Sequence, residues 1–326
     1  MLNLSFFKYK KFLKGESVSF NRWGSKRNNS WVFSVFKHHY TEIIKMHNAY
    51  KIIPQYIYND LGNIKKAQWT DITSKHFGEI SKNPYGEELF DNLKEWSRYF
   101  NIFSTWSKYS SILALSGNFE IYIDKIITIA IESDVGLLIN FPQSIDGIKL
   151  KKTNNFLNHD LIEQRVLSCV KGTWYQRIDN IEKIFNWKPE LLCDDKNVKL
   201  LENIRKKRND AAHAYGRNIK KSKTTYGLEF TELTNISEEF IMSYFHLVYR
   251  LAKEIDKYLL NKHIGEFQCL NFYHELRSSN VIKLNNMSSQ QIGCASEVLR
   301  KMYDNYSSTA MGKKYYRGLV DYYENL

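Results

Sequence analysis

The sequence predicts an all-α protein built around an antiparallel four-helix bundle, with mainly helical extensions before and after it. Three kinds of observation indicate this fold. Apolar residues recur at three- and four-residue steps over several stretches, which gathers them on one face of a helix. Capping residues stand where these stretches begin, and glycine or proline stands where they end. Four such stretches within about 160 residues are typical of a helical bundle.

The first bundle helix is predicted from about Ser107 onward. Its apolar residues follow the helical period and form one stripe, which consists of Ile112, Leu115, Phe119, Ile123, Ile126, Ile127 and Ala130. A polar stretch with glycine and proline, residues 134–158, separates this helix from the next one.

The second bundle helix is predicted in two parts. Asp160 and Glu163 match a capping box for a helix that runs to about Val170, where Gly172 interrupts it. The helical pattern then resumes in a second apolar stripe, which consists of Ile178, Ile181, Ile184 and Phe185.

The third and fourth bundle helices follow a break at Pro189. Asp194 and Asp195 are expected to cap the third helix, and Asn235 with Glu238 the fourth. The third helix carries the apolar residues Val198, Leu201 and Ile204, and most of a basic cluster lies on the same helix. The fourth ends before Gly265, and its buried stripe consists of Ile241, Tyr244, Val248, Leu251, Ile255 and Leu259.

These patterns divide the chain into three predicted domains. Residues 1–106 form a basic, aromatic-rich region of unknown role, in which residues 31–36 could be a strand or, as we expect, the start of a helix that runs through Tyr50. Residues 107–262 form the bundle. Residues 263–326 form a helical extension whose amphipathic helix carries Ile292, Ala295, Val298, Leu299 and Met302, followed by a polar, tyrosine-rich end.

The composition restricts the class of protein. With 326 residues, of which 43% are hydrophobic, the chain can close a sizeable core. Its 47 basic and 35 acidic residues give a net charge of +12, which favours a polyanionic partner. The four cysteines form no C-x-x-C pair, so no zinc knuckle or disulfide framework is predicted. No stretch reaches transmembrane length, and we expect a cytoplasmic protein that makes no membrane contact.

Positive charge is concentrated in two zones. Residues 1–66 carry 12 basic residues and three acidic ones, and residues 196–223 carry ten basic and two acidic residues. The second zone includes Arg205, Lys206, Lys207 and Arg217, which are predicted to contact RNA phosphates. The alternative is a solvated helix face, because basic residues near a helix C-terminus are also favoured by the helix dipole.

The segment Arg208-Asn-Asp-Ala-Ala-His213 combines residue types suited to phosphodiester chemistry. On a helix, Arg205, Asn209 and His213 are four residues apart and share one face, which the long side chain of Arg208 can reach. Histidine can act as base or acid near neutral pH, and arginine offers a bidentate fork to phosphate oxygens. RNA cleavage by its own 2′-hydroxyl needs both functions and requires no metal or other cofactor.

This motif, placed at the end of a third helix, resembles the HEPN superfamily over about residues 107–262. The resemblance implies a metal-independent endoribonuclease of a toxin or antiviral-defence system. Arg208 and His213 would be catalytic, and Asn209 would support them. Members of this superfamily usually dimerise so that two motifs face each other, so a homodimer is implied.

Tyr215 adds a narrower resemblance. The toxin branch that is paired with minimal nucleotidyltransferases carries Arg-x4-His-x-Tyr, as do Arg208, His213 and Tyr215. In that branch the tyrosine is adenylylated, which would imply modification of Tyr215 and an antitoxin or regulatory partner. This chain departs from the branch because it is much longer.

Two other functions remain open from the sequence. One is a non-catalytic HEPN-like adaptor whose basic helix docks RNA or a protein. The other is a metal nuclease that uses acidic groups such as Asp194 and Asp195, although no paired acidic motif with a lysine at suitable spacing supports it. A third interpretation assigns Arg208 and His213 only a favourable interaction with the helix dipole.

Overall fold

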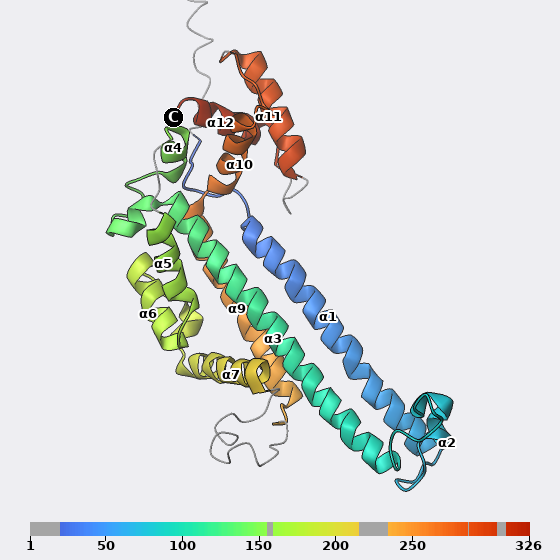
Figure 1. The fold of residues 1–326 in the computed structure, drawn as a ribbon. Coiled ribbons are helices and arrows are strands. Elements are labelled where there is room, and N and C mark those ends of the chain that lie inside the picture. Colours follow the sequence, from blue (N-terminus) through green and yellow to red (C-terminus); the bar gives the residue numbers. More distant parts are fainter. Residues whose placement is uncertain (1–19, 155–158, 215–233, 286, 305–310) are drawn as a thin grey trace, which may run out of the picture.

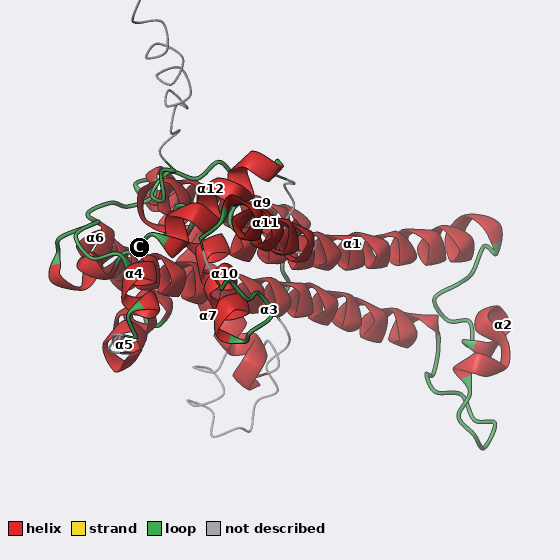
Figure 2. Ribbon diagram, turned by 90° about the horizontal axis from the view of Figure 1, so that it is seen from above, coloured by secondary structure: helices red, strands yellow, loops and turns green. Residues whose placement is uncertain are grey.

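The computed structural model describes residues 20–154, 159–214, 234–285, 287–304 and 311–326. Within these ranges the chain forms helices joined by turns and loops, and no strand occurs there (Figure 2). The prediction of an all-α fold is therefore confirmed.

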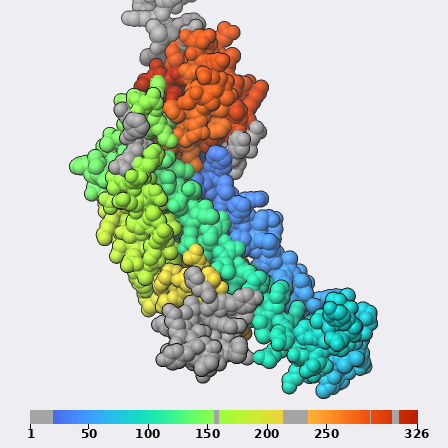
Figure 3. Space-filling view, viewed as in Figure 1, coloured from blue at the N-terminus to red at the C-terminus, as the bar shows by residue number. Residues whose placement is uncertain are grey.

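Two long helices, α1 (Trp31–Asn59) and α3 (Leu93–Ser133), lie side by side and give the molecule its elongated shape (Figures 1 and 3). Helix α1 begins after Ser30, whose hydroxyl accepts a hydrogen bond from the backbone N–H three residues further on, at 3.0 Å. Aromatic residues of α1 pack on α3, and the ring centroids of Phe36 and Tyr122 are 5.0 Å apart. The predicted helix from Trp31 is confirmed.

Helix α3 begins earlier than its apolar stripe predicts. The stripe indicates a start near Ser107, whereas the helix begins at Leu93. The Asn92 side chain caps it by accepting a hydrogen bond from the Glu95 N–H at 3.0 Å. The added turns carry apolar residues on more than one face, because Tyr99, Ile102 and Trp106 are exposed whereas Leu93 is buried. For this reason the helical period is hard to see in this part of the sequence.

Short elements connect α1 to α3 at one end of the long pair (Figure 1). Phe77 from this connection packs on Trp96 of α3, with ring centroids 4.8 Å apart, and so fixes the connection to the long helix. The elements are a π-helical turn η1 (Asp60–Ile64), α2 (Ser74–Phe77) and a 3₁₀ turn η2 (Gly78–Ser81).

The predicted bundle helices are all present. Helices α5, α7 and α9 pack on α3, and α6 packs on α5 and α7. Gly172, with φ of +91°, separates α5 from α6, which confirms the predicted interruption. The helices span α5 (His159–Val170), α6 (Trp174–Phe185), α7 (Asp195–Ala214) and α9 (Glu238–Leu259), with a 3₁₀ turn η4 (Glu190–Leu192) before α7.

Two predicted helix caps are wrong. Asp160 lies inside α5, which begins at His159, so it does not occupy the N-cap position. Helix α9 is capped by Ser237, not Asn235, and the Ser237 hydroxyl accepts a hydrogen bond from the N–H three residues on at 3.2 Å. Several polar residues precede each helix, and the sequence alone does not decide which of them takes the cap geometry.

The core lies between α3, α9 and the helices around them. All six residues predicted for the α9 stripe are buried, and so are the seven predicted for α3. The Tyr122 hydroxyl of α3 donates a hydrogen bond to the Ala252 carbonyl of α9 at 2.8 Å, which fixes the register between the two helices. Among the described residues, no helix is both long and apolar enough to cross a bilayer.

The C-terminal helices gather at the other end of the molecule, opposite α2 (Figure 1). The predicted amphipathic helix is α11, and the tyrosine-rich end also proves to be a helix, α12, with Tyr315, Tyr316 and Tyr323 buried. The elements here are η3 (Val135–Ile139), α4 (Gly147–Lys152), the π-helical turn η5 (Leu260–Ile264), α10 (Phe267–Ser278), α11 (Ser289–Asp304) and α12 (Lys313–Glu324).

Buried polar contacts join the segment before α1 to this end. The Arg22 guanidinium lies 2.9 Å from an Asp146 carboxylate oxygen and donates to the Ser133 carbonyl at 2.6 Å. Glu266 accepts hydrogen bonds from the Lys26 backbone N–H at 2.9 Å and from the Tyr315 hydroxyl. A charge buried with its partners is tolerated, whereas a charge left without them would be costly.

Asp256 of α9 is a buried carboxyl held by the start of α1. It accepts hydrogen bonds from the Ser30 backbone N–H at 3.1 Å and from the Ser30 hydroxyl. Burial raises the pKa of Asp256 from 3.8 to about 6, although the hydrogen bonds from Ser30 oppose this shift. The folded protein therefore holds a proton on Asp256 at pH values where the unfolded chain has released it.

We predict that Asp256→Asn removes a stability loss that the wild type shows as the pH rises. The pKa of Asp256 is higher in the folded protein than in the unfolded chain, so its protonated carboxyl contributes about 3 kcal/mol to the free energy of unfolding below about pH 4. This contribution is lost as the pH rises from about 4 to about 6. Urea unfolding of both proteins at several pH values measures the difference. Parallel stability curves for the two proteins would contradict this assignment.

Candidate functional site

The predicted catalytic motif occupies the last turns of α7. This helix begins after Asp194, whose carboxylate accepts a hydrogen bond from the Lys196 N–H at 2.9 Å, as the capping interpretation predicts. The backbone of His213 belongs to α7, but its side chain lies outside the described part of the structure. Tyr215 and Arg217 also lie outside the described residues.

The apolar face of α7 directs its arginines toward α3 and α6. Val198, Leu201 and Ile204 are buried. Arg205 and Arg208 follow one and four residues after Ile204, and both line a small hollow that α3, α6, α7 and α9 enclose. The helical period thus places the motif arginine at the rim of the core.

Glu120 of α3 joins two arginines within this hollow. Its carboxylate lies 2.9 Å from Nη2 of Arg208 and 3.3 Å from Nη2 of Arg177 on α6. The side chain of Arg177 is 5% exposed and that of Arg208 is 34% exposed. The carboxylate therefore compensates a buried charge on one side and restrains the motif arginine on the other.

Arg205 has a separate carboxylate partner. Its Nη2 lies 2.5 Å from Glu202 one turn earlier, and the Glu202 carboxylate also accepts a hydrogen bond from the Trp174 N–H at 3.2 Å. The hydrogen bond from Arg205 lowers the pKa of Glu202, and the pKa of Arg205 is raised in return. This pairing compensates the charge of Arg205, which is one of the predicted RNA contacts.

The other predicted residues of α7 are placed differently. Lys206 is exposed, while Lys207 and Asn209 are half-buried. The ammonium group of Lys207 lies 5.8 Å from the centroid of the Phe240 ring on α9. Among Arg205, Lys206, Lys207 and Arg208, all of which the structure describes, Lys206 is therefore the most accessible to a phosphate in solution.

The floor of the hollow is polar but narrow. The hydroxyls of Ser116 and Tyr244 are hydrogen-bonded at 2.8 Å, and burial raises the pKa of Tyr244 well above its ordinary value. The cavity measures about 20 Å³, which is enough for one water molecule and too small for a nucleotide. A nucleic acid would have to contact Arg208 from the outer rim.

The charges of the arginines and glutamates around the hollow do not cancel. Arg177, Arg205 and Arg208 face the two carboxylates of Glu120 and Glu202, which leaves one positive charge in excess. Burial lowers the pKa of Arg177, and the charges of Arg205 and Arg208 act in the same direction, while Glu120 opposes them. An anion at the rim would relieve the repulsion among the three guanidinium groups.

Sequence reasoning did not identify Glu120 or Arg177. A signal was present, since Ser116 and Glu120 are polar residues four apart beside the apolar stripe of α3, and Arg177 precedes the stripe of α6. A polar residue beside a buried helix face needs a partner, but the sequence does not say which one. The partners of Glu120 are 57 and 88 residues away.

The acidic residues that a metal nuclease would need have other roles. Asp194 caps α7, and Asp195 pairs with Lys199 at 2.6 Å and accepts a hydrogen bond from the Tyr175 hydroxyl at 3.2 Å. Among the described residues, no group of three histidine, cysteine or acidic side chains is arranged to hold a metal ion.

Comparisons with protein-family models, with curated proteins and with solved structures gave no match to this chain. No family is therefore shown for it.

Proposed function

We propose that this protein is a metal-independent endoribonuclease of the HEPN type, which cuts RNA by attack of the 2′-hydroxyl and acts as a toxin or antiviral effector. One observation carries the proposal. Arg208, held by Glu120, projects from the end of a basic helix five residues before His213, in the order and spacing of the HEPN motif. The helices around α7 would then be the HEPN-like bundle.

The chemistry assigns a separate task to each residue. His213 removes the proton of the 2′-hydroxyl or protonates the leaving 5′-oxygen. Arg208 donates hydrogen bonds to the non-bridging oxygens as negative charge gathers on phosphorus. A homodimer that apposes two motifs supplies both a base and an acid, and Asn209 supports the pair. An antitoxin or another regulatory partner would hold such an activity in check.

Glu120 is proposed as a positioning residue for Arg208. A guanidinium carries five N–H groups, and the carboxylate engages Nη2, which leaves other donors for a phosphate. Restraining a long side chain before substrate arrives lowers the entropy lost on binding it in the reactive geometry.

A non-catalytic RNA-binding adaptor is the second candidate. It is favoured by the same ion pair, because Arg208 already has a carboxylate partner and the cavity beside it holds no more than a water molecule. In that case the basic residues of α7 would bind RNA without cutting it.

We predict that His213→Ala and Arg208→Lys both abolish RNA cleavage in EDTA. The first loses the acid–base group, and the second replaces a fork by a point charge, with a rate loss of about 100-fold or more. Wild-type products should carry 2′,3′-cyclic phosphate and 5′-hydroxyl ends. Lys199→Gln on the same helix is the control and should cleave normally. RNA binding without cleavage by the wild type would favour the adaptor.

We predict that Glu120→Gln lowers both stability and turnover. Loss of the carboxylate leaves Arg177 without its charge partner, and the free energy of unfolding should fall by about 1 to 3 kcal/mol. The kcat should fall about tenfold while RNA affinity is kept or improved, because a negative charge has been removed. The control is Glu42→Gln, which breaks an exposed pair with Lys45. A wild-type kcat in Glu120→Gln would refute the positioning role.

A further inference from the structure

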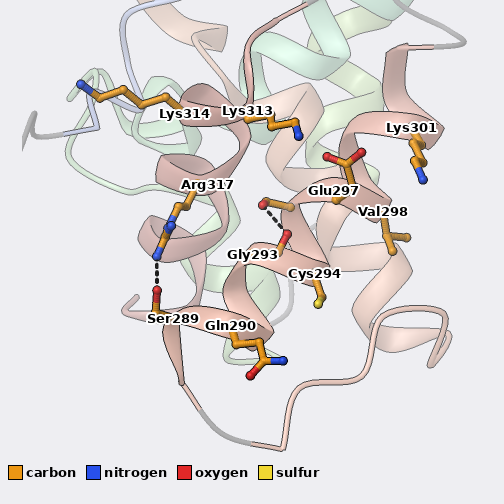
Figure 4. A pocket seen from close by; sticks show the side chains of 11 residues that line it. Ser289, Gln290, Gly293, Cys294, Glu297, Val298, Lys301, Lys313, Lys314 and Arg317 are labelled. Carbon is orange, nitrogen blue, oxygen red and sulfur yellow. Dashed lines mark hydrogen bonds between the residues drawn. The ribbon is translucent and has the colours of Figure 1, made fainter.

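The surface between α11 and α12 is hollowed. One cavity of about 720 Å³ lies between these helices, and a second of about 700 Å³ adjoins it. Ser289, Lys314 and Arg317 line both cavities, so the two form one continuous depression. Figure 4 shows Arg317 directed at Ser289, with which it forms a hydrogen bond. We call this depression the basic groove.

Positive charge dominates the basic groove. The first cavity is lined by four cationic side chains, Lys301, Lys313, Lys314 and Arg317, and by one acidic side chain, Glu297 (Figure 4). Glu297 is already paired with Arg300 at 2.7 Å. Within the described part of the chain, none of the four lining cations forms an ion pair. The second cavity adds Lys26 and Asp321, whose charges offset each other.

The fold does not need these cations for its own packing. Helix α12 buries Tyr315, Tyr316, Leu319 and other residues of one face, whereas Lys313, Lys314 and Arg317 are all exposed. Two of them stand in the first turn, after an N-cap glycine with no capping side chain. The positive end of a helix dipole disfavours cations there and favours an anion. The cations that line the cavity and their unfavourable position at the start of α12 both favour an anionic ligand.

The shape of the groove favours a strand over a small anion. A small ligand is normally enclosed over most of its surface, whereas this depression continues from one cavity into the next along α12. The cavity that the four cations line has no aromatic side chain on which a base could stack, whereas Phe20 and Tyr315 line the second cavity. Contacts with a backbone rather than with bases are therefore expected in the first cavity.

We propose that the basic groove binds the phosphate backbone of a single RNA strand. The proposal extends the proposed function, since it supplies the substrate with a second contact remote from Arg208. Helix α9 runs from the motif, where Phe240 meets Lys207, to the C-terminal helices, over about 33 Å for its 22 residues. A strand that reaches from the groove to the motif must span several nucleotides.

The test measures binding without cleavage. Fluorescence anisotropy of a labelled 2′-O-methyl oligoribonucleotide of about 20 residues is recorded over a range of salt concentrations. The probe cannot be cut through its 2′-oxygen. The groove variant is Lys313→Gln, Lys314→Gln and Arg317→Gln together. The matched control replaces three exposed lysines outside the groove, Lys37, Lys94 and Lys183, by glutamine.

The groove variant should bind at least about tenfold more weakly at low salt, and its salt slope should fall by about 2, whereas the control should keep the wild-type slope. Equal loss in both variants, or none in either, would overturn the proposal. So would displacement of the probe by inorganic phosphate at an equal phosphate concentration.

Cleavage of ordinary RNA is measured separately on the same proteins. If the wild type binds through the groove but does not cut, the groove stands and the ribonuclease proposal fails. If the wild type cuts RNA while the groove variant binds the probe normally, the ribonuclease stands and the groove proposal fails.

Discussion

The burial of α3 on several sides is the constraint on which the rest of the structure depends. Helices α1, α5, α7 and α9 all pack against it, and from Ser107 to its end only Ala114, Ile121 and Lys125 are exposed. Polar side chains on such a helix must find partners inside the protein. Asn118 donates to the Phe36 carbonyl at 3.1 Å, and Tyr122 to that of Ala252. Glu120 meets the same requirement by pairing with two arginines. The candidate site is thus part of the packing of α6 and α7 around α3.

Much of the fold could be predicted from the sequence, because helical periodicity is a local property. The stripes of α3, α6 and α9 are buried as expected. The sequence predicted the ends of the helices less exactly. Ser237 rather than Asn235 caps α9, and α3 begins at Leu93 rather than near Ser107. The choice between neighbouring polar residues, and the docking of aromatic side chains, depend on tertiary packing that a local pattern does not contain.

The candidate site could be predicted only in part. The motif in α7 is contiguous, so Arg208 and His213 could be proposed from their residue types, their place at the end of a basic helix and a resemblance to the HEPN motif. Glu120 and Arg177 could not, since each belongs to another helix and their meeting depends on how α3, α6 and α7 pack. Arg205 was predicted to contact RNA without any partner for it being named, whereas Glu202 one turn away compensates its charge. A pair three residues apart on a helix is a local feature that could have been recognised.

The hydrogen bonds between Ser30 and Asp256 have a consequence for biosynthesis. The two residues are 226 positions apart, so Ser30 leaves the ribosome about 10 to 45 s before its partner. Glu266, which holds the Lys26 backbone, follows later still. During that interval the aromatic face of α1 has no complete core to join. Contacts of such long range slow folding, and the nascent chain must be kept from aggregation until α9 and α10 have been made.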